Sequence, residues 1–268
     1  MALNQTNKLA WIVENIYKAE KCRCLNDINM ERTETLREAL IPLYKHLLKS
    51  VSSFNNKKAT FCLQWGENFP TKDNTGIIFV GRATNGWITS SEDIDVLFDS
   101  NDDNIFARSD QMQWVENLEG NRNGYNTKKS AFWRVIKSVA MHFYPHKWTS
   151  YIAWSNVCKI APWDGGNPCD SLYYAQLDDC KKILEKEIEI LSPLFVVMLT
   201  GKSWSSDFIS YLNKGKELKC ILSKSWKGYY CSVYKIDNIY YLISEHPQGK
   251  PERIHAQCII DIISNLLW

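Results

Sequence analysis

Continuous apolar runs are the feature that most constrains how this chain can fold. The runs at 76–81 ("GIIFVG") and 194–201 ("LFVVMLTG") contain almost no polar residue, and each ends in glycine. A strand that is apolar on both sides is typical of a sheet covered on both faces. Further strand-like runs lie at 151–160, 218–222, 229–235 and 239–244. The sequence therefore predicts a sheet buried between two layers.

Segments with the helical spacing of apolar residues alternate with these strands. They lie at 4–20, 31–52, 130–144, 172–191, 203–213 and 251–267. Strands that alternate with helices indicate a parallel sheet with helices on both faces. We therefore expect an α/β fold, a three-layer α/β/α sandwich around a mostly parallel central sheet.

The order of these segments suggests how the chain is divided. The first two helices precede all the strands, so we expect residues 1–55 to form a helical extension packed on a main domain at 56–268. A chain of 268 residues can bury one large core of this kind. We expect the protein to be a monomer.

Composition excludes few classes of protein. No apolar run approaches the roughly 18 residues that cross a bilayer, so we expect no membrane partner. The N-terminal segment carries Glu14 and Glu20, which a signal peptide would not, and we expect a cytoplasmic location. The net charge of +2 neither indicates nor excludes nucleic acid, because a local basic patch is enough to bind it.

The nine cysteines give little indication of a metal site. Most of them lie inside apolar runs, where a reduced thiol acts as a small apolar side chain. Cys22 and Cys24 have a metal-like spacing but lack a second close pair. We expect no metal and no cofactor.

Polar loops follow four of the strands, and the most unusual of them contains a histidine. The loops read "GRATNGW" (81–87), "SNVCKIAPWDGGNP" (155–168), "TGKSW" (200–204) and "EHPQGK" (245–250). Ligands bind at the carboxyl ends of the strands in parallel sheets, so these loops predict one shared site. A structural role remains open, because His246 could cap its strand and Asn156 could satisfy backbone groups.

Taken in order, these loops resemble the uracil-DNA glycosylase superfamily. The resemblance covers roughly residues 76–264 and is closest in "SNVCKIAPWDGGNP" and in the helix that leads to Pro193 and the next apolar strand. The final "EHPQGK" resembles the family's late histidine-proline motif. The resemblance implies the same three-layer fold and an enzyme that rotates a base out of the stack before cleaving its bond to the sugar.

The resemblance also implies a role for each matching residue. His246 would stabilise the charge that develops on the departing base, and Asn156 would recognise the base. Other base-binding residues would be Gly81, Arg82, Thr84, Trp87 and Pro162. Nucleic-acid contacts would come from Lys202, Gln248, Lys250 and Arg253.

Two positions depart from the family pattern. Active members usually carry Asp, Asn or Glu two positions after the glycine of the first loop, where this chain has Ala83. Asn85 is then the nearest polar residue that could orient the attacking water, with Thr84 beside it. Some members hold an iron–sulfur cluster with four cysteines, but Ile160 occupies one of the corresponding positions, so we expect no cluster here.

Three functions remain open from the sequence. The first is a DNA glycosylase that hydrolyses the N-glycosidic bond of uracil or a modified base in single- or double-stranded DNA. The second is a catalytically inactive module that binds nucleic acid or a nucleobase, which the residue Ala83 favours. The third is a hydrolase of free nucleotides.

Overall fold

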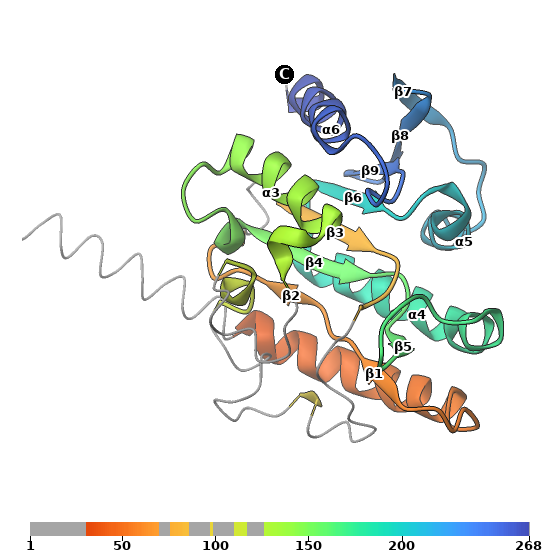
Figure 1. Cartoon of the computed structure of the whole chain (residues 1–268). Helices are drawn as coiled ribbons and strands as arrows, with labels where there is room; N and C mark the ends of the chain where they lie inside the picture. The colour runs from red at the N-terminus through yellow and green to blue at the C-terminus, as the bar shows by residue number, and fades with distance from the viewer. Residues whose placement is uncertain (1–30, 70–75, 86–96, 99–109, 117–125, 268) are drawn as a thin grey trace, which may run out of the picture.

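The computed structural model describes residues 31–69, 76–85, 97–98, 110–116 and 126–267 (Figure 1). The predicted helix at 4–20 and the residues Cys22, Cys24 and Trp87 lie outside the described residues. Within them, a central sheet lies between two layers of helices (Figure 1). The predicted three-layer α/β/α fold is confirmed.

Four parallel strands form the centre of the sheet. In spatial order they are β4 (Ile152–Asn156), β3 (Ile77–Gly81), β6 (Phe195–Leu199) and β9 (Ile239–Ser244). Every residue of β3, β4 and β6 is buried, because helices cover both faces of the sheet. Since the four strands are parallel, their carboxyl ends meet at one edge of the sheet.

Antiparallel strands extend the sheet at both ends. On one side β2 (Gln64–Trp65) pairs with β4, and on the other β8 (Tyr229–Ile236) joins β9 to the outermost strand β7 (Cys220–Trp226). A separate two-stranded sheet contains β1 (Lys58–Thr60) and β5 (Ile160–Pro162). Sequence patterns predicted neither β1 nor β2, which are only three and two residues long.

The predicted strand at 151–160 was wrong in its extent. It ends at Asn156, and Ile160 begins the separate strand β5. The N–H groups of Val157 and Cys158 donate to the carbonyls of Gly81 and Arg82, at 2.9 and 2.8 Å. The chain therefore turns across the end of β3 instead of continuing along the sheet.

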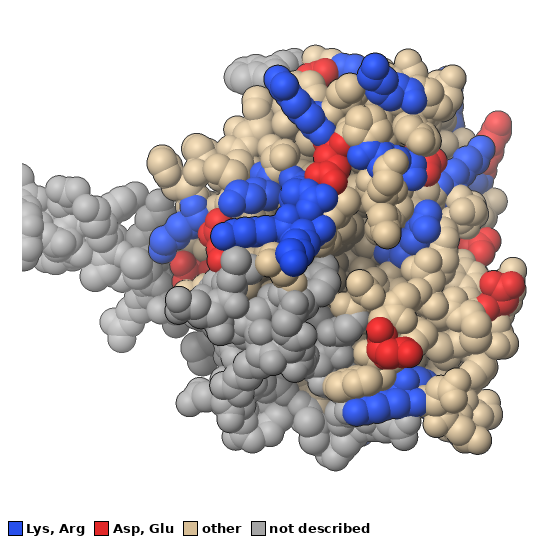
Figure 2. All heavy atoms as spheres, viewed as in Figure 1, with Lys and Arg blue, Asp and Glu red and all other residues tan. Residues whose placement is uncertain are grey.

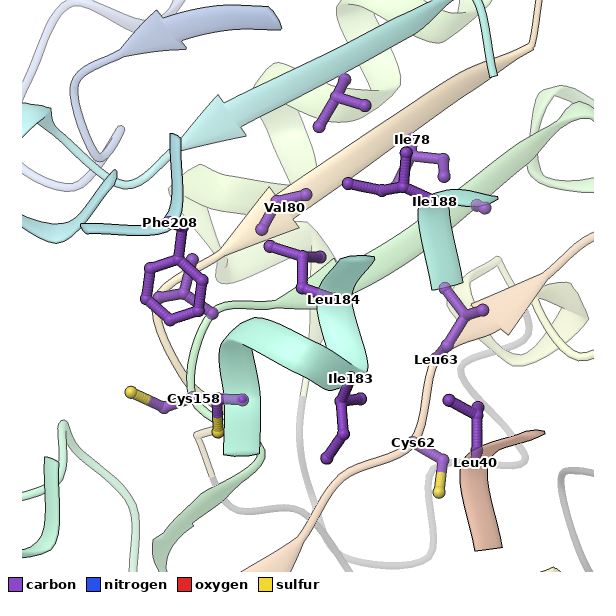
Figure 3. Close-up of a cluster of buried hydrophobic side chains, with 14 of the residues drawn as sticks. Leu40, Cys62, Leu63, Ile78, Val80, Cys158, Ile183, Leu184, Ile188 and Phe208 are labelled. Carbon is purple, nitrogen blue, oxygen red and sulfur yellow. The ribbon is translucent and has the colours of Figure 1, made fainter. Parts of the chain in front are cut away.

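Different helices cover the two faces of the sheet. The helices α3 (Ala131–Phe143) and α6 (Glu252–Leu267) pack with one apolar cluster. A second cluster on the opposite face contains side chains of the 31–50 helix, α4 (Asp170–Leu191) and α5 (Lys202–Leu212). Figure 3 shows part of this second cluster, in which Leu184 and Ile188 of α4 lie against Ile78 and Val80 of β3.

The helix at 31–50 shares the core of the main domain. Its buried residues Leu36, Leu40 and Leu47 belong to the same cluster as β3 and α4. Tyr44 donates a hydrogen bond of 2.6 Å from its hydroxyl to the carbonyl of Phe61. The division of the chain at residue 55 stays a prediction. None of the described helices is both long and apolar enough to cross a membrane.

A fully buried ion pair fixes α4 to the chain that leaves β4. Lys159 Nζ donates to Glu187 Oε2 at 2.8 Å and to Ser155 Oγ at 2.7 Å, and both charged side chains are 0 % exposed. Burial raises the pKa of Glu187, and the hydrogen bonds from Lys159 and Ser155 oppose that shift. Removing one partner of such a pair leaves an uncompensated charge in the core.

The buried pair gives a stability prediction. Glu187→Leu should lower the free energy of unfolding by about 3–5 kcal/mol, because it leaves Lys159 charged and unpaired. The double variant Lys159→Met/Glu187→Leu should regain most of that loss, since no buried charge remains. Urea denaturation measures both variants, and Lys186→Ala, which removes an exposed ion pair, is the control. A double variant no more stable than the single one would contradict the explanation.

His255 of α6 is buried against the sheet. It is 0 % exposed, lies 4.1 Å from the Trp226 ring centroid in a parallel stack, and shares a 2.8 Å hydrogen bond from its Nε2 with Ser244 Oγ. α6 turns this side chain toward the sheet. Burial and the nearby charge of Lys250 lower the pKa of His255 to about 3.

The buried histidine predicts sensitivity to acid. An unfolded histidine binds a proton as the pH falls through about 6.5, whereas folded His255 stays neutral until about pH 3. The unfolded state therefore gains protons first, and this residue should lower the unfolding free energy by roughly 2 kcal/mol between pH 7 and pH 5. Between pH 7 and pH 5, the free energy of unfolding of His255→Asn should fall by less than that of the wild-type protein, as measured by urea denaturation at both pH values. The control variant His142→Asn, which changes an exposed histidine, should show the same decrease as the wild-type protein.

Candidate functional site

Strand alternation sends the last side chains of β3 and β4 toward α3. Phe79 and Trp154 belong to the apolar cluster beneath α3 and α6, and Gly81 and Asn156 follow them by two residues each. Residues two apart along a strand share a face. The parallel register pairs Gly81 directly with Asn156.

Asn156 carries an unsatisfied donor at this edge of the sheet. The side chain is 1 % exposed, and its Nδ2 has no hydrogen-bond partner among the residues that the structure describes. Buried amide groups are normally paired, so an unpaired one needs an explanation. A ligand with a hydrogen-bond acceptor would satisfy this group.

Gly81 is required for this placement of Asn156. A Cβ atom at residue 81 would overlap Oδ1 of Asn156 and would lie 3.2 Å from the ring of Phe132. Only glycine therefore allows the amide and the aromatic ring to meet over the end of β3. Phe132, in the first turn of α3, is a site residue that the sequence analysis missed.

His246 joins this group from the loop after β9. Its ring is nearly parallel to that of Phe132, with 13° between the planes and 6.2 Å between the centroids. The backbone N–H of Gln248 donates to Nδ1 of His246 at 3.4 Å. In a neutral ring whose Nδ1 accepts, Nε2 carries the hydrogen and is the donor. We call Gly81, Phe132, Asn156 and His246 the strand-end cluster.

The surroundings of His246 keep its ring neutral. Burial lowers its pKa to about 4, and the positive charges of Arg82 and Lys250 act in the same direction. The ring is therefore an uncharged hydrogen-bond donor at neutral pH. The same two cations would favour negative charge on a ligand bound beside it.

Arg82 and Glu245 lie toward the other face of the sheet. Arg82 Nε donates to the carbonyl of Thr200 at 2.7 Å, and its guanidinium carbon lies 5.4 Å from the Trp204 ring centroid. Burial lowers the pKa of Arg82, and the negative charge of Glu245 partly opposes this. Lys250 Nζ lies 3.9 Å from a carboxylate oxygen of Glu245.

The loop after β3 holds the two residues expected near the attacking water. Asn85 is exposed, and its Oδ1 accepts a hydrogen bond of 3.0 Å from the N–H of Gly166. Asn85 thus connects two loops at this edge. Thr84 is 3 % exposed, and its Oγ1 has no hydrogen-bond partner in the described part of the chain.

The remaining predicted residues lie around this edge on several elements. Pro162 ends β5 beside the loop that contains Gly166. Gln248 and Lys250 lie on the His246 loop. Lys202 and Arg253 are exposed in the first turns of α5 and α6, on opposite faces of the sheet. Lysine and arginine side chains gather over α3 and the adjoining start of α6 (Figure 2).

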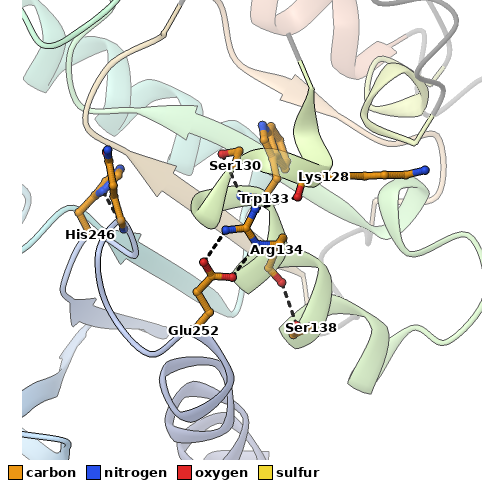
Figure 4. A network of polar contacts seen from close by, with 8 residues as sticks. Lys128, Ser130, Trp133, Arg134, Ser138, His246 and Glu252 are labelled. Atoms are coloured by element: carbon orange, nitrogen blue, oxygen red, sulfur yellow. Dashed lines mark hydrogen bonds and ion pairs between the residues drawn. The ribbon is translucent and has the colours of Figure 1, made fainter.

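An ion pair joins the two elements that carry Phe132 and His246. Arg134 of α3 donates from Nε and Nη2 to the two carboxylate oxygens of Glu252 at 2.7 and 2.5 Å, and its Nη1 donates to the carbonyl of Lys128 (Figure 4). Glu252 begins α6, six residues after His246. The hydrogen bonds from Arg134 lower the pKa of Glu252. A pairing across 118 residues leaves no local sequence signal.

Among the described residues, no group of three or more His, Cys, Asp or Glu side chains could hold a metal ion. Cys180 is buried, and its Sγ accepts from the N–H of Lys159 at 3.4 Å. This thiol therefore has a structural contact in the core.

Comparison with known proteins gives a family match. The family model of the uracil DNA glycosylase superfamily matches residues 60–250, which is more than half of the chain. The matched region contains all four members of the strand-end cluster. No curated protein matches the chain.

The contact between Gly81 and Asn156 gives a prediction. Gly81→Ala should lower the free energy of unfolding by about 1–3 kcal/mol, because the added methyl group displaces the Asn156 amide in a packed region. The double variant Gly81→Ala/Asn156→Ala should recover part of this loss, since the overlapping atom is removed. Thermal and urea denaturation measure these two variants and the single variant Asn156→Ala. If the losses of the two single variants simply add, the proposed overlap is wrong.

Proposed function

The chain belongs to the uracil-DNA glycosylase superfamily, and from this premise we propose that it hydrolyses the N-glycosidic bond of uracil or a modified base in DNA. The observation that carries the proposal is the buried Asn156 amide, whose Nδ2 has no partner among the described residues. It lies beside the Phe132 ring, which is nearly parallel to the ring of neutral His246. A flat base with carbonyl oxygens on its edge is the ligand that this combination fits.

Each member of the cluster has a role in binding the base. The face of Phe132 would stack on the ring, a contact that any flat heterocycle can make. Asn156 would donate from Nδ2 to a carbonyl oxygen of the base and accept with Oδ1 from the adjacent ring N–H, which suits uracil. Gly81 leaves room for both contacts.

His246 would act on the leaving group. When the bond between the sugar carbon and the base nitrogen breaks, the electron pair stays on the base and charge develops on its carbonyl oxygen. The Nε2–H of neutral His246 would donate to that oxygen, as preorganised donors do at other oxyanions. The charges of Arg82 and Lys250 add to this stabilisation. Water then adds to the sugar carbon and loses a proton, and the departed base anion takes up a proton, which leaves an abasic site and the neutral free base.

The attacking water is assigned to the loop after β3. We keep Asn85 as the residue that orients it, through the Nδ2 group that the Gly166 contact leaves available. The hydroxyl of Thr84, which has no partner within the described ranges, is a second group that could hold water. Neither side chain is a strong proton acceptor. In the transition state, the bond to the departing nucleobase should therefore be more broken than the bond to water is formed.

Two observations favour a second candidate function, that of a binding module without catalysis. Ala83 stands at the position where active relatives usually carry a water-activating side chain, and Asn85 Oδ1 is engaged by Gly166. Such a module would bind a nucleobase or nucleic acid through the same strand-end cluster and would not cleave it.

Release of free base from uracil-containing oligonucleotides tests the proposal. Wild-type protein should release uracil, and His246→Ala should slow release by about 10²–10³-fold because the donor at the leaving oxygen is lost. Asn156→Ala should weaken base recognition, and His142→Ala, an exposed histidine on α3, is the matched control. Both single and double strands and free deoxyuridine monophosphate should be assayed.

The outcomes separate the three functions. If only the free nucleotide is cleaved, the protein is a hydrolase of free nucleotides and DNA is not its substrate. If every substrate stays intact while uracil-containing DNA still binds and Asn156→Ala weakens that binding, the binding module is the correct function. If neither binding nor cleavage depends on Asn156 or His246, the strand-end cluster is not the site.

A further inference from the structure

The α4–α5 side of the same sheet edge carries a group of aromatic side chains outside the strand-end cluster. Tyr173 and Tyr174 lie in the first turn of α4, and Trp204 lies in the first turn of α5. Tyr173 contacts both other rings edge to face, with centroid distances of 5.3 Å to Tyr174 and 5.2 Å to Trp204. Arg82 connects this group to the strand-end cluster, because it follows Gly81 and packs over Trp204.

A fourth aromatic residue lies beyond β9. Tyr230 is the second residue of β8, which pairs antiparallel with β9 so that Ser232 faces Ile243. Continuing this register brings Tyr230 beside Glu245, next to His246. Cys231 and Val233 are buried in the cluster beneath α6, so the alternating Tyr230 projects to the α5 side of the sheet. We call Tyr173, Tyr174, Trp204 and Tyr230 the aromatic rim.

Two members of the aromatic rim are unusually exposed. Tyr174 is 69 % exposed and Tyr230 is 64 % exposed, the two highest values among the exposed large apolar side chains that the structure describes. A single exposed aromatic residue needs no explanation. Here the two most exposed rings lie at the same edge of the sheet, with the ends of β6 and β9 between them.

Positive charges accompany these rings. Lys202 and Lys227 are exposed, at the start of α5 and in the turn before β8, and neither has an ion-pair partner in the described residues. Arg82 leaves Nη1 and Nη2 without hydrogen bonds in the described part of the chain, since only Nε is used. Exposed rings among cations are what a single-stranded nucleic acid requires, with stacking for its bases and charge for its phosphates.

We propose that the aromatic rim stacks unpaired bases on both sides of the target nucleotide, so that the preferred ligand is single-stranded nucleic acid. This inference rests on the proposed function for the position of the target base. In a duplex the faces of each base are covered by its neighbours, and an exposed tyrosine has no face to stack on. In a single strand the flanking bases are free to turn onto Tyr174 and Tyr230.

Binding of a strand without a target base tests this inference apart from catalysis. The probe is a fluorescein-labelled oligothymidine, used free and annealed to oligoadenosine, with binding to the full-length protein followed by anisotropy. The single strand should bind more tightly than the duplex. Tyr174→Ala and Tyr230→Ala should each weaken single-strand binding by roughly 5- to 150-fold, the range expected for losing one stacked base.

The chain offers a matched control. Tyr151 is a half-buried tyrosine just before β4, at the opposite, amino-terminal edge of the sheet, where it stacks on Tyr144. Tyr151→Ala should leave binding unchanged. Because Tyr174 and Tyr230 are largely exposed, their alanine variants should melt as wild type does, which excludes unfolding as the cause of weaker binding.

The outcomes distinguish this inference from the proposed function. Equal binding of duplex and single strand, or alanine variants that bind as wild type does, would overturn the role of the aromatic rim even if uracil is excised. If single-strand binding depends on Tyr174 and Tyr230 but the protein releases no base, the stacking role of the aromatic rim would be supported and the proposed glycosylase activity would be excluded.

Discussion

The buried pair between Lys159 and Glu187 is the interaction on which the geometry of the candidate site depends. Lys159 lies three residues after Asn156, and its side chain is fixed to Glu187 of α4 and to Ser155 of β4. Its backbone is fixed as well, because its N–H donates to Cys180 and its carbonyl accepts from Phe61. The segment that follows Asn156 is thus held between α4 and the two-stranded sheet of β1 and β5. Two charges buried away from water tolerate little displacement from each other. Moving them apart weakens their attraction, whereas the free-energy cost of their desolvation stays the same.

From this fixed turn, ordinary strand geometry produces the strand-end cluster. The register of β3 and β4 pairs Gly81 with Asn156. Side-chain alternation directs both positions toward α3, where Phe132 lies in the first turn. His246 enters from β9, and the cations around it disfavour a charged ring. The chemistry follows from position. A donor that has no partner within the described residues, a flat ring and a neutral donor lie where three parallel strands end. Nothing in this arrangement requires an unusual backbone conformation at Asn156 or His246.

The sequence predicted what local patterns encode and missed what tertiary contacts decide. Apolar runs identified β3, β6 and β9, because burial on both faces leaves a continuous signal along a strand. The end of β4 was predicted too late, since the turn at Val157 depends on carbonyls of another strand. Phe132 looks like any apolar residue in a helix, and only the absence of a Cβ atom at Gly81 makes it part of the site. The burial of His255 depends on how α6 rests on the sheet, which helical spacing alone does not specify.

The pair between Arg134 and Glu252 has a consequence for how the site responds to its medium. It joins α3, which carries Phe132, to the start of α6, which follows the His246 loop, and both side chains remain partly exposed. Dissolved ions screen partly exposed pairs, while the apolar packing beneath them is unaffected. Ionic strength therefore acts on the protein in two ways. In the proposed function it would weaken the attraction for phosphates, and it would weaken the ion pair that joins the helix of Phe132 to the segment after His246. Under the proposed function, salt would then change the fit of a base as well as the affinity for a strand.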